Sequence, residues 1–192
     1  MREIIKLGLI LLLITSVAAS ILGLSNGLTE GKIEEVEAKA SEEARKEVLP
    51  GTDSFKSIDD NKFKAIKDEN DKILEVYKGM SDGSLAGYAI KTVTSGYGGD
   101  VEVITGISIE GKITGIKVVK HLETPGLGAN ATSADFQDQY KGISTDKEVV
   151  RVKTNPSKDN EIQALTGATI TSDTVTDCVN MARELFNDRL NK

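Results

Sequence analysis

The chain has few residues of the types that bind metals or form disulfides. Its 192 residues include one Cys, one His and no Trp, and aromatic residues make up 4%. A single Cys excludes an intrachain disulfide and an iron–sulfur cluster, which requires several thiolates. It also excludes a structural zinc site built from four Cys or His side chains. Redox chemistry by this chain would therefore require an organic cofactor.

Basic residues are also outnumbered. The formal net charge is −6 at pH 7, and residues 26–192 contain 22 basic and 29 acidic side chains, a net charge of −7. Nucleic-acid binding depends on Lys and Arg side chains that neutralise phosphates. The charge balance therefore argues against a nucleic-acid partner.

A long uncharged segment lies near the N-terminus. Residues 7–24 (LGLILLLITSVAASILGL) form a run of 18 residues that can cross a bilayer as a helix. A cleaved signal peptide is the alternative, but the apolar sequence continues past the small residues at 18–20, which favours an anchor. Arg2 and Lys6 place residues 1–6 in the cytoplasm by the positive-inside rule. We expect a single transmembrane helix at residues 7–25 in the cell (inner) membrane, with the rest of the chain on the extracytoplasmic side.

The remainder of the chain is predicted to be a spacer followed by one domain. Residues 30–48 are rich in Glu, Ala and Lys, which is typical of a solvated helix. Pro50-Gly51 ends this helix, so the helical spacer is placed at residues 26–50. The domain is placed at residues 51–192. Its first part, residues 52–83, is predicted to be irregular, with short strands near Ile58 and at 73–77.

The middle of the chain alternates between apolar and polar residues. Residues 86–94 and 101–109 show this period of two, which predicts strands, and residues 113–119 form a third. Glu110-Gly111-Lys112 is a plausible hairpin turn, so antiparallel pairing is expected. A short helix is expected at 133–141 and a further strand at 148–153. These elements predict an α+β fold, with one N-terminal transmembrane helix followed by a mixed domain with an antiparallel sheet.

Two glycine-rich segments interrupt the predicted strands. Ser95–Asp100 (SGYGGD) has three glycines, which permit unusual backbone angles and close approach of a ligand; a flexible hairpin loop is the alternative. After the third strand, His121–Gly128 (HLETPGLG) contains Pro125-Gly126, a pair that favours a tight turn. Such a turn would hold Leu127 outward, where its side chain can pack on a flat ring.

The segment Leu165–Ser172 (LTGATITS) precedes the last predicted helix, whose apolar residues recur every three or four positions up to Leu190. Thr171 or Ser172 is expected to cap this helix, because a hydroxyl oxygen accepts from first-turn N–H groups. A helix start also attracts anions. The segment therefore suits a phosphate site, with a simple capping turn as the alternative. Asp173 adds a negative charge that opposes anion binding.

Several blocks in one order resemble a known family. Thr166–Thr169 (TGAT) resembles the S/T-G-A-T flavinylation motif of the FMN-binding domain family, found in the G subunit of the Rnf complex and the C subunit of the sodium-pumping NADH:quinone reductase. Glu123–Gly128 (ETPGLG) closely resembles the signature of the Rnf G subunit. Ser95–Gly99 (SGYGG) precedes that block and Phe136–Gly142 (FQDQYKG) follows it, as in the family. The resemblance covers essentially the whole chain, with residues 30–83 the least diagnostic.

The resemblance implies a membrane-anchored flavoprotein subunit of an ion-translocating ferredoxin:NAD oxidoreductase complex. In the family, the last threonine of the motif, here Thr169, carries FMN through a phosphoester bond. This FMN relays electrons on the outer face, and a separate flavin transferase attaches it from FAD. The implied partners are the membrane D and E subunits and the ferredoxin- and NAD-reactive B and C subunits. No catalytic or metal-binding residue of its own is expected.

The same resemblance, together with the glycine loops, indicates which residues contact the cofactor. Those expected to bind FMN beside the attachment residue Thr169 are Gly96, Tyr97, Gly98, Glu123, Thr124, Pro125, Gly126, Leu127, Gly128, Thr166, Gly167, Ala168, Thr171 and Ser172. The alternative function is a membrane-anchored extracytoplasmic ligand-binding or assembly module without redox activity. Cys178 lies near the apolar stripe of the last helix and is interpreted as a buried small hydrophobe.

Overall fold

The computed structural model describes residues 1–191, apart from the side chain of Glu34. Lys192, the last residue of the predicted domain, lies outside the described residues. The chain divides into two compact units, residues 1–40 and 41–192.

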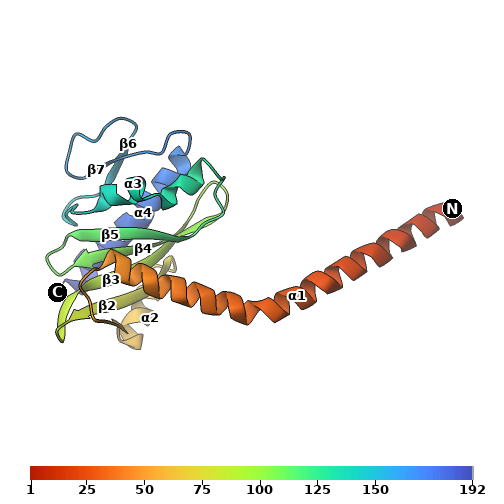
Figure 1. The fold of residues 1–192 in the computed structure, drawn as a ribbon, viewed down its shortest axis with the longest axis horizontal. Coiled ribbons are helices and arrows are strands. Elements are labelled where there is room, and N and C mark those ends of the chain that lie inside the picture. The colour runs from red at the N-terminus through yellow and green to blue at the C-terminus, as the bar shows by residue number, and fades with distance from the viewer. Residues whose placement is uncertain (192) are drawn as a thin grey trace. The chain divides into compact units, whose positions relative to one another are not determined.

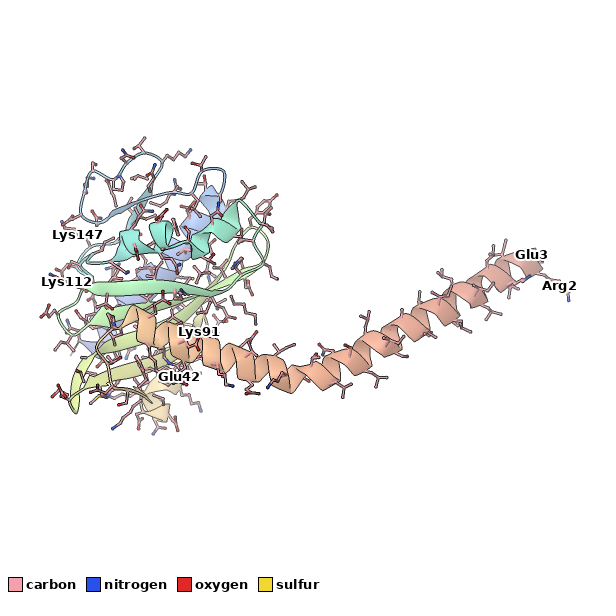
Figure 2. The ribbon with its side chains drawn as sticks, viewed as in Figure 1. Arg2, Glu3, Glu42, Lys91, Lys112 and Lys147 are labelled. Atoms are coloured by element: carbon pink, nitrogen blue, oxygen red, sulfur yellow. The ribbon has the colours of Figure 1, made fainter. Side chains whose placement is uncertain are left out.

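From Arg2 onward, the first unit consists of helix α1 (Arg2–Val48), which continues into the second unit. Its most apolar 18-residue window has a mean hydropathy of 2.5, so α1 is long and apolar enough to cross a membrane. Figure 2 shows its side chains, with Arg2 and Glu3 labelled near the start. Apolar side chains such as Leu11, Leu12 and Leu13 are exposed along it. Helix α1 includes the residues 7–25 that were predicted to cross the membrane.

The second unit is built on a five-stranded antiparallel sheet with the strand order β1-β2-β3-β4-β5 (Figure 1). Consecutive strands pair with one another, and β3, β4 and β5 correspond to the three predicted strands, except that β4 ends one residue earlier than predicted. The α+β fold with an antiparallel sheet is therefore confirmed. The strands are β1 (Ser54–Ser57), β2 (Ile73–Ser81), β3 (Ser84–Ser95), β4 (Asp100–Ser108) and β5 (Ile113–Lys120).

Helix α4 (Thr169–Leu185) packs on one face of this sheet, chiefly against β3 and β4. Its apolar stripe includes Val175 and Val179, which share a buried cluster with Val101 and Val103 of β4. Cys178 is fully buried in the same cluster, and burial raises the pKa of its thiol to about 11. The interpretation of this residue as a small hydrophobe is confirmed. A single turn of π-helix, η3 (Phe186–Leu190), continues α4.

The other face of the sheet is covered by the last turns of α1, within the second unit. Ala44 and Val48 are buried there with Ala89 of β3 and Ile104 of β4. The sequence predicted a solvated spacer as far as residue 48, and this is wrong for the last turns. Since both faces are covered, the middle of β4 is buried at every position from 103 to 107.

A ladder of ion pairs crosses the same face. Lys91, labelled in Figure 2, lies 2.8 Å from a carboxylate oxygen of Glu102 and 3.6 Å from one of Glu75. Arg45 of α1 donates to Glu75 at 3.1 Å and stacks over the ring of Tyr77. These contacts join the end of α1 to the sheet by polar as well as apolar interactions.

Two regions differ from the sequence-based expectations. Helix α2 (Asp60–Glu69) lies in the segment 52–83, which was expected to be irregular; the Asp59 side chain caps it by accepting from two first-turn N–H groups. The helix expected at 133–141 is split into α3 (Ala134–Gln137) and the short 3₁₀ helix η2 (Asp138–Tyr140). A further 3₁₀ helix, η1 (Gly128–Thr132), precedes it, and the parallel strands β6 (Val150–Val152) and β7 (Glu161–Gln163) follow it.

Candidate functional site

A cavity of about 620 Å³ lies where three loops converge at the N-terminal end of α4. These loops follow β3, follow β5 and precede α4, so they come from three distant parts of the sequence. The volume of the cavity is in the range of small-molecule binding sites. The predicted residues that line it are Tyr97, Glu123, Thr124, Leu127, Gly128, Gly167, Ala168, Thr169 and Thr171; Ile170, which was not predicted, completes the wall.

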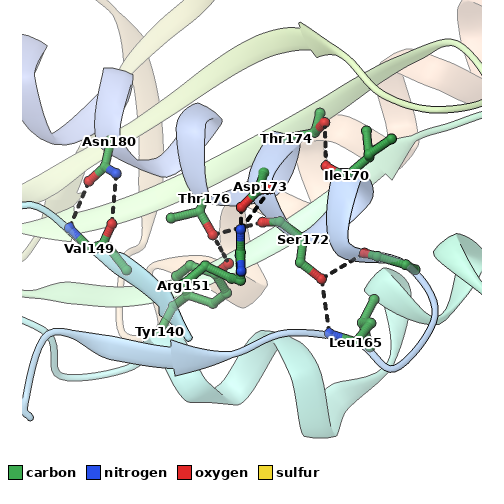
Figure 3. Close-up of polar contacts among 11 residues, drawn as sticks. Tyr140, Val149, Arg151, Leu165, Ile170, Ser172, Asp173, Thr174, Thr176 and Asn180 are labelled. Carbon is green, nitrogen blue, oxygen red and sulfur yellow. Dashed lines mark hydrogen bonds and ion pairs between the residues drawn. The ribbon is translucent and has the colours of Figure 1, made fainter. Parts of the chain in front are cut away.

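Helix α4 begins at Thr169, earlier than the sequence suggested. The N-cap residue is Ala168, and no side chain caps the helix. The expectation that Thr171 or Ser172 caps it is therefore wrong. Both hydroxyls lie inside the first turn, where Ser172 accepts from the Leu165 N–H at 2.9 Å and donates to the Ala168 carbonyl at 2.9 Å (Figure 3). The Ser172 side chain thus holds the loop against the helix.

This uncapped start gives the cavity a site for negative charge. First-turn N–H groups without a side-chain cap and the positive end of the helix dipole both favour an anion. Asp173 was expected to oppose this, but Arg151 on β6 pairs with it through two hydrogen bonds of 2.6 and 3.0 Å (Figure 3). The Arg151 guanidinium offsets the Asp173 charge.

Glu123 links its own loop to the loop after β3 and to the first turn of α4. Its Oε1 accepts from the backbone N–H groups of Tyr97 at 2.8 Å and Gly98 at 3.1 Å. Its Oε2 accepts from the Thr171 hydroxyl at 2.7 Å. The side chain is 5% exposed. An ionised carboxylate only accepts hydrogen bonds, and its two oxygens can accept from the two N–H groups and the hydroxyl together.

Two of the glycines make room for this carboxylate. A Cβ atom at Gly96 would collide with Oε1 of Glu123, and one at Gly128 would collide with Oε2 and with the Thr171 hydroxyl. At Gly98, a Cβ atom would collide with the backbone carbonyl of Leu122. Gly96 and Gly98 themselves are not among the residues that line the cavity. In this structure these glycines allow the loops to pack on one another.

Comparison with known proteins shows the family to which the chain belongs. Residues 96–184 match the family model described as an FMN-binding domain. The G subunit of the Na(+)-translocating ferredoxin:NAD(+) oxidoreductase complex of Acetobacterium woodii is 46% identical, over 97% of this chain and 93% of the relative. The G subunit of the ion-translocating oxidoreductase complex of Methanosarcina acetivorans is 32% identical, over 94% of this chain and 93% of the relative. The chain belongs to this family of G subunits.

The fold also has a counterpart among solved structures. The crystal structure of the C subunit of the Na(+)-translocating NADH-quinone reductase from Parabacteroides distasonis aligns with a TM-score of 0.54 and 23% identity, over 61% of this chain and 62% of that chain. At this identity the likeness concerns the fold alone.

The cavity has residues suited to the flavin ring of FMN and others suited to its phosphate. Tyr97, Leu127 and Ile170, at the cavity, are 73%, 45% and 53% exposed, and such apolar groups can pack on a flavin ring. The uncapped start of α4 can receive the phosphate, and the partly exposed Thr169 stands at that point. Residues that would hold FMN are therefore present in one place.

The remaining predicted site residues lie around this cavity rather than on its wall. Pro125 and Gly126 form an exposed turn beside it, where Gly126 has a φ of +78° that favours glycine. Thr166 lines a separate polar hollow together with Asn130. Ser172 is fully buried. Contact of FMN with these residues, as with those that line the cavity, stays a prediction.

Two residues of the site, Ile170 and Arg151, were not predicted from the sequence. Ile170 was overlooked because it lies between hydroxyl residues of the motif, and its side chain emerges at the cavity only because the helix starts at Thr169. Arg151 lies 22 residues before its partner Asp173. Its position in a strand next to α4 gave no sequence signal, since pairing of two distant side chains depends on the fold.

Proposed function

We propose that this chain is the membrane-anchored flavoprotein subunit of an ion-translocating ferredoxin:NAD oxidoreductase (Rnf) complex, and that it relays electrons through FMN bound covalently to Thr169. The carrying observation is that Thr169 stands at an uncapped helix start inside a cavity with exposed apolar side chains. Membership in the family of G subunits supports the same assignment. The bound FMN would supply reversible acceptance and release of electrons.

Different parts of the cavity would bind the phosphate and the flavin ring. First-turn N–H groups of α4 would neutralise the phosphate, which in a diester carries one negative charge. Leu127 would pack on the flavin ring. The covalent bond would keep the local flavin concentration at roughly millimolar or above, which matters outside the cytoplasm where free FMN is scarce.

The attachment step requires a second enzyme in this proposal. A threonine hydroxyl is a weak nucleophile without an adjacent base. The carboxylate at the cavity wall, Glu123, already accepts three hydrogen bonds and is not free to serve as that base. A flavin transferase would use FAD: the bond between Thr169 Oγ1 and the FMN phosphorus forms, the bond from that phosphorus to the bridging oxygen of AMP breaks, AMP leaves, and the hydroxyl proton is released.

Intact-mass measurement tests the proposal. The protein is produced with and without a flavin transferase, and its peptides are then mapped. We expect a gain of one FMN less one water, confined to the peptide that contains Thr169. No gain, with the transferase active on another substrate, would leave an anchored ligand-binding or assembly module as the better function.

Exchanging Arg151 for Met is expected to slow FMN attachment severalfold. The change leaves the charge of Asp173 unpaired close to the start of α4, where it repels the incoming phosphate. Because the pair is partly exposed, stability should fall by less than about 1 kcal/mol. Time-resolved intact mass measures the rate. The additional change Asp173→Asn should restore it, and an unaltered rate in R151M alone would contradict this role of the ion pair.

The proposed membrane orientation places residues 1–6 in the cytoplasm, residues 7–25 in the membrane and the flavin domain outside. We propose as partners the other Rnf subunits, namely the membrane D and E subunits and the ferredoxin- and NAD-reactive B and C subunits. Arg2 and Lys6 on one side of the apolar run support the orientation.

Labelling of introduced cysteines tests this orientation. Ser84→Cys adds an exposed thiol to the domain, while Cys178 is buried with a raised pKa and contributes little background. A maleimide that does not cross membranes should label Ser84→Cys in intact cells and should label Glu3→Cys only after lysis. The reverse pattern would place the domain in the cytoplasm.

A further inference from the structure

We propose that Glu123 is the positioning residue of the cofactor cavity: its hydrogen bonds hold its own loop, the loop after β3 and the first turn of α4 together, and its carboxylate gives the cavity wall a fixed negative charge. This inference rests on the proposed function for the identity of the cofactor. The holding of the loops is a property of the chain itself and can be tested without any flavin.

The contacts of Glu123 join segments that are far apart in the sequence. Tyr97 and Gly98 lie 26 and 25 residues before it, and Thr171 lies 48 residues after it. These donors belong to the loop after β3 and to the first turn of α4, so one side chain determines how both are spaced from its own loop. Removing it leaves two loop N–H groups and one buried hydroxyl without their acceptor.

The glycines show that the loops are shaped around this carboxylate. At Gly96 and Gly128 a side chain would occupy the space that the two carboxylate oxygens fill. These glycines belong to the two loops that Glu123 joins to each other. Glycine at these two positions therefore leaves room for the Glu123 side chain. From the sequence alone, this reason for glycine could not be distinguished from the close approach of a ligand.

Two consequences follow for the cavity. The Thr171 hydroxyl donates to Glu123, which fixes the first turn of α4 two residues beyond Thr169. The carboxylate is almost fully buried and lines the cavity, so its charge is weakly screened there. A buried negative charge disfavours the addition of electrons to a group beside it.

Hydrogen exchange of the full-length, flavin-free protein in detergent tests the positioning. In Glu123→Ala, we expect the amides of Tyr97 and Gly98 to exchange about tenfold faster or more, because both lose their acceptor. Glu123→Gln should keep most of the protection, since its amide oxygen accepts from the two N–H groups. Thr171→Val provides a milder variant that removes only one of the three hydrogen bonds.

The midpoint potential of the attached FMN tests the charge. In Glu123→Gln the shape is kept and the charge is removed, so the potential should shift to less negative values. Glu110→Gln is the matched control, because this exposed carboxylate lies on the β4–β5 turn away from the cavity; it should leave the potential unchanged.

Each outcome has a definite meaning. Unchanged exchange at Tyr97 and Gly98 in Glu123→Ala would overturn the positioning role. An equal potential for Glu123→Gln and the wild type, with FMN attached to both, would overturn the role of the charge. Failure of the wild type to acquire FMN would refute the proposed function, while the exchange measurement would still decide whether Glu123 holds the loops.

Discussion

Thr169→Val is expected to abolish covalent FMN attachment, with no residual flavin surviving denaturation of the protein. Valine has nearly the shape of threonine but lacks the hydroxyl, so the bond to phosphorus cannot form. Thr169 is the first residue of α4 and is partly exposed, which makes its replacement by another β-branched residue structurally mild. Intact mass and in-gel flavin fluorescence measure the loss.

Thr124→Val is the matched control for this prediction. Thr124 is exposed and lines the same cavity, but it lies outside the start of α4. This variant should acquire one FMN like the wild type. Attachment of the flavin to Thr124 in the wild type, or retention of covalent FMN in Thr169→Val, would show that the attachment residue has been assigned incorrectly.

Gly106→Ala is expected to destabilise the domain by about 2–3 kcal/mol. Gly106 lies on β4 under the last turn of α1, where an added Cβ would collide with the backbone carbonyl of Val48 and lie 2.6 Å from the Thr114 hydroxyl. That hydroxyl donates to the same carbonyl. The backbone cannot yield as a flexible side chain does, so the end of α1 would have to leave the sheet. Denaturant unfolding of the protein in detergent measures the change.

Gly115→Ala provides the comparison, because Gly115 is the direct cross-strand partner of Gly106 on β5. A Cβ atom there would meet Val48 at 3.4 Å, an ordinary van der Waals contact. Its stability should stay within about 1 kcal/mol of the wild type, since alanine also restricts the unfolded chain. Equal losses in the two variants would mean that the packing of α1 on the sheet does not cause the effect.

The sequence was most informative where a local pattern decides the outcome. Alternation predicted the strands at 86–94 and 101–109, and the apolar steps after Ser172 predicted α4. The blocks at 95–99, 123–128 and 166–169 were each recognised, and the fold brings most of their residues to one cavity. Helix α2 was not predicted because it is short and contains few apolar residues, although Asp59 was available as a capping residue.

The sequence alone determined the apolar helix, the antiparallel sheet and the residues that identify the family, because these depend on local period and on short motifs. Only the tertiary structure decided which contacts the motif residues make. It placed Glu123 among donors from another loop and from the first turn of α4, paired Arg151 with Asp173, and buried Ala44 and Val48 on the sheet. Hydrogen bonds and packing between residues tens of positions apart depend on how the chain folds back on itself, and no local pattern records that.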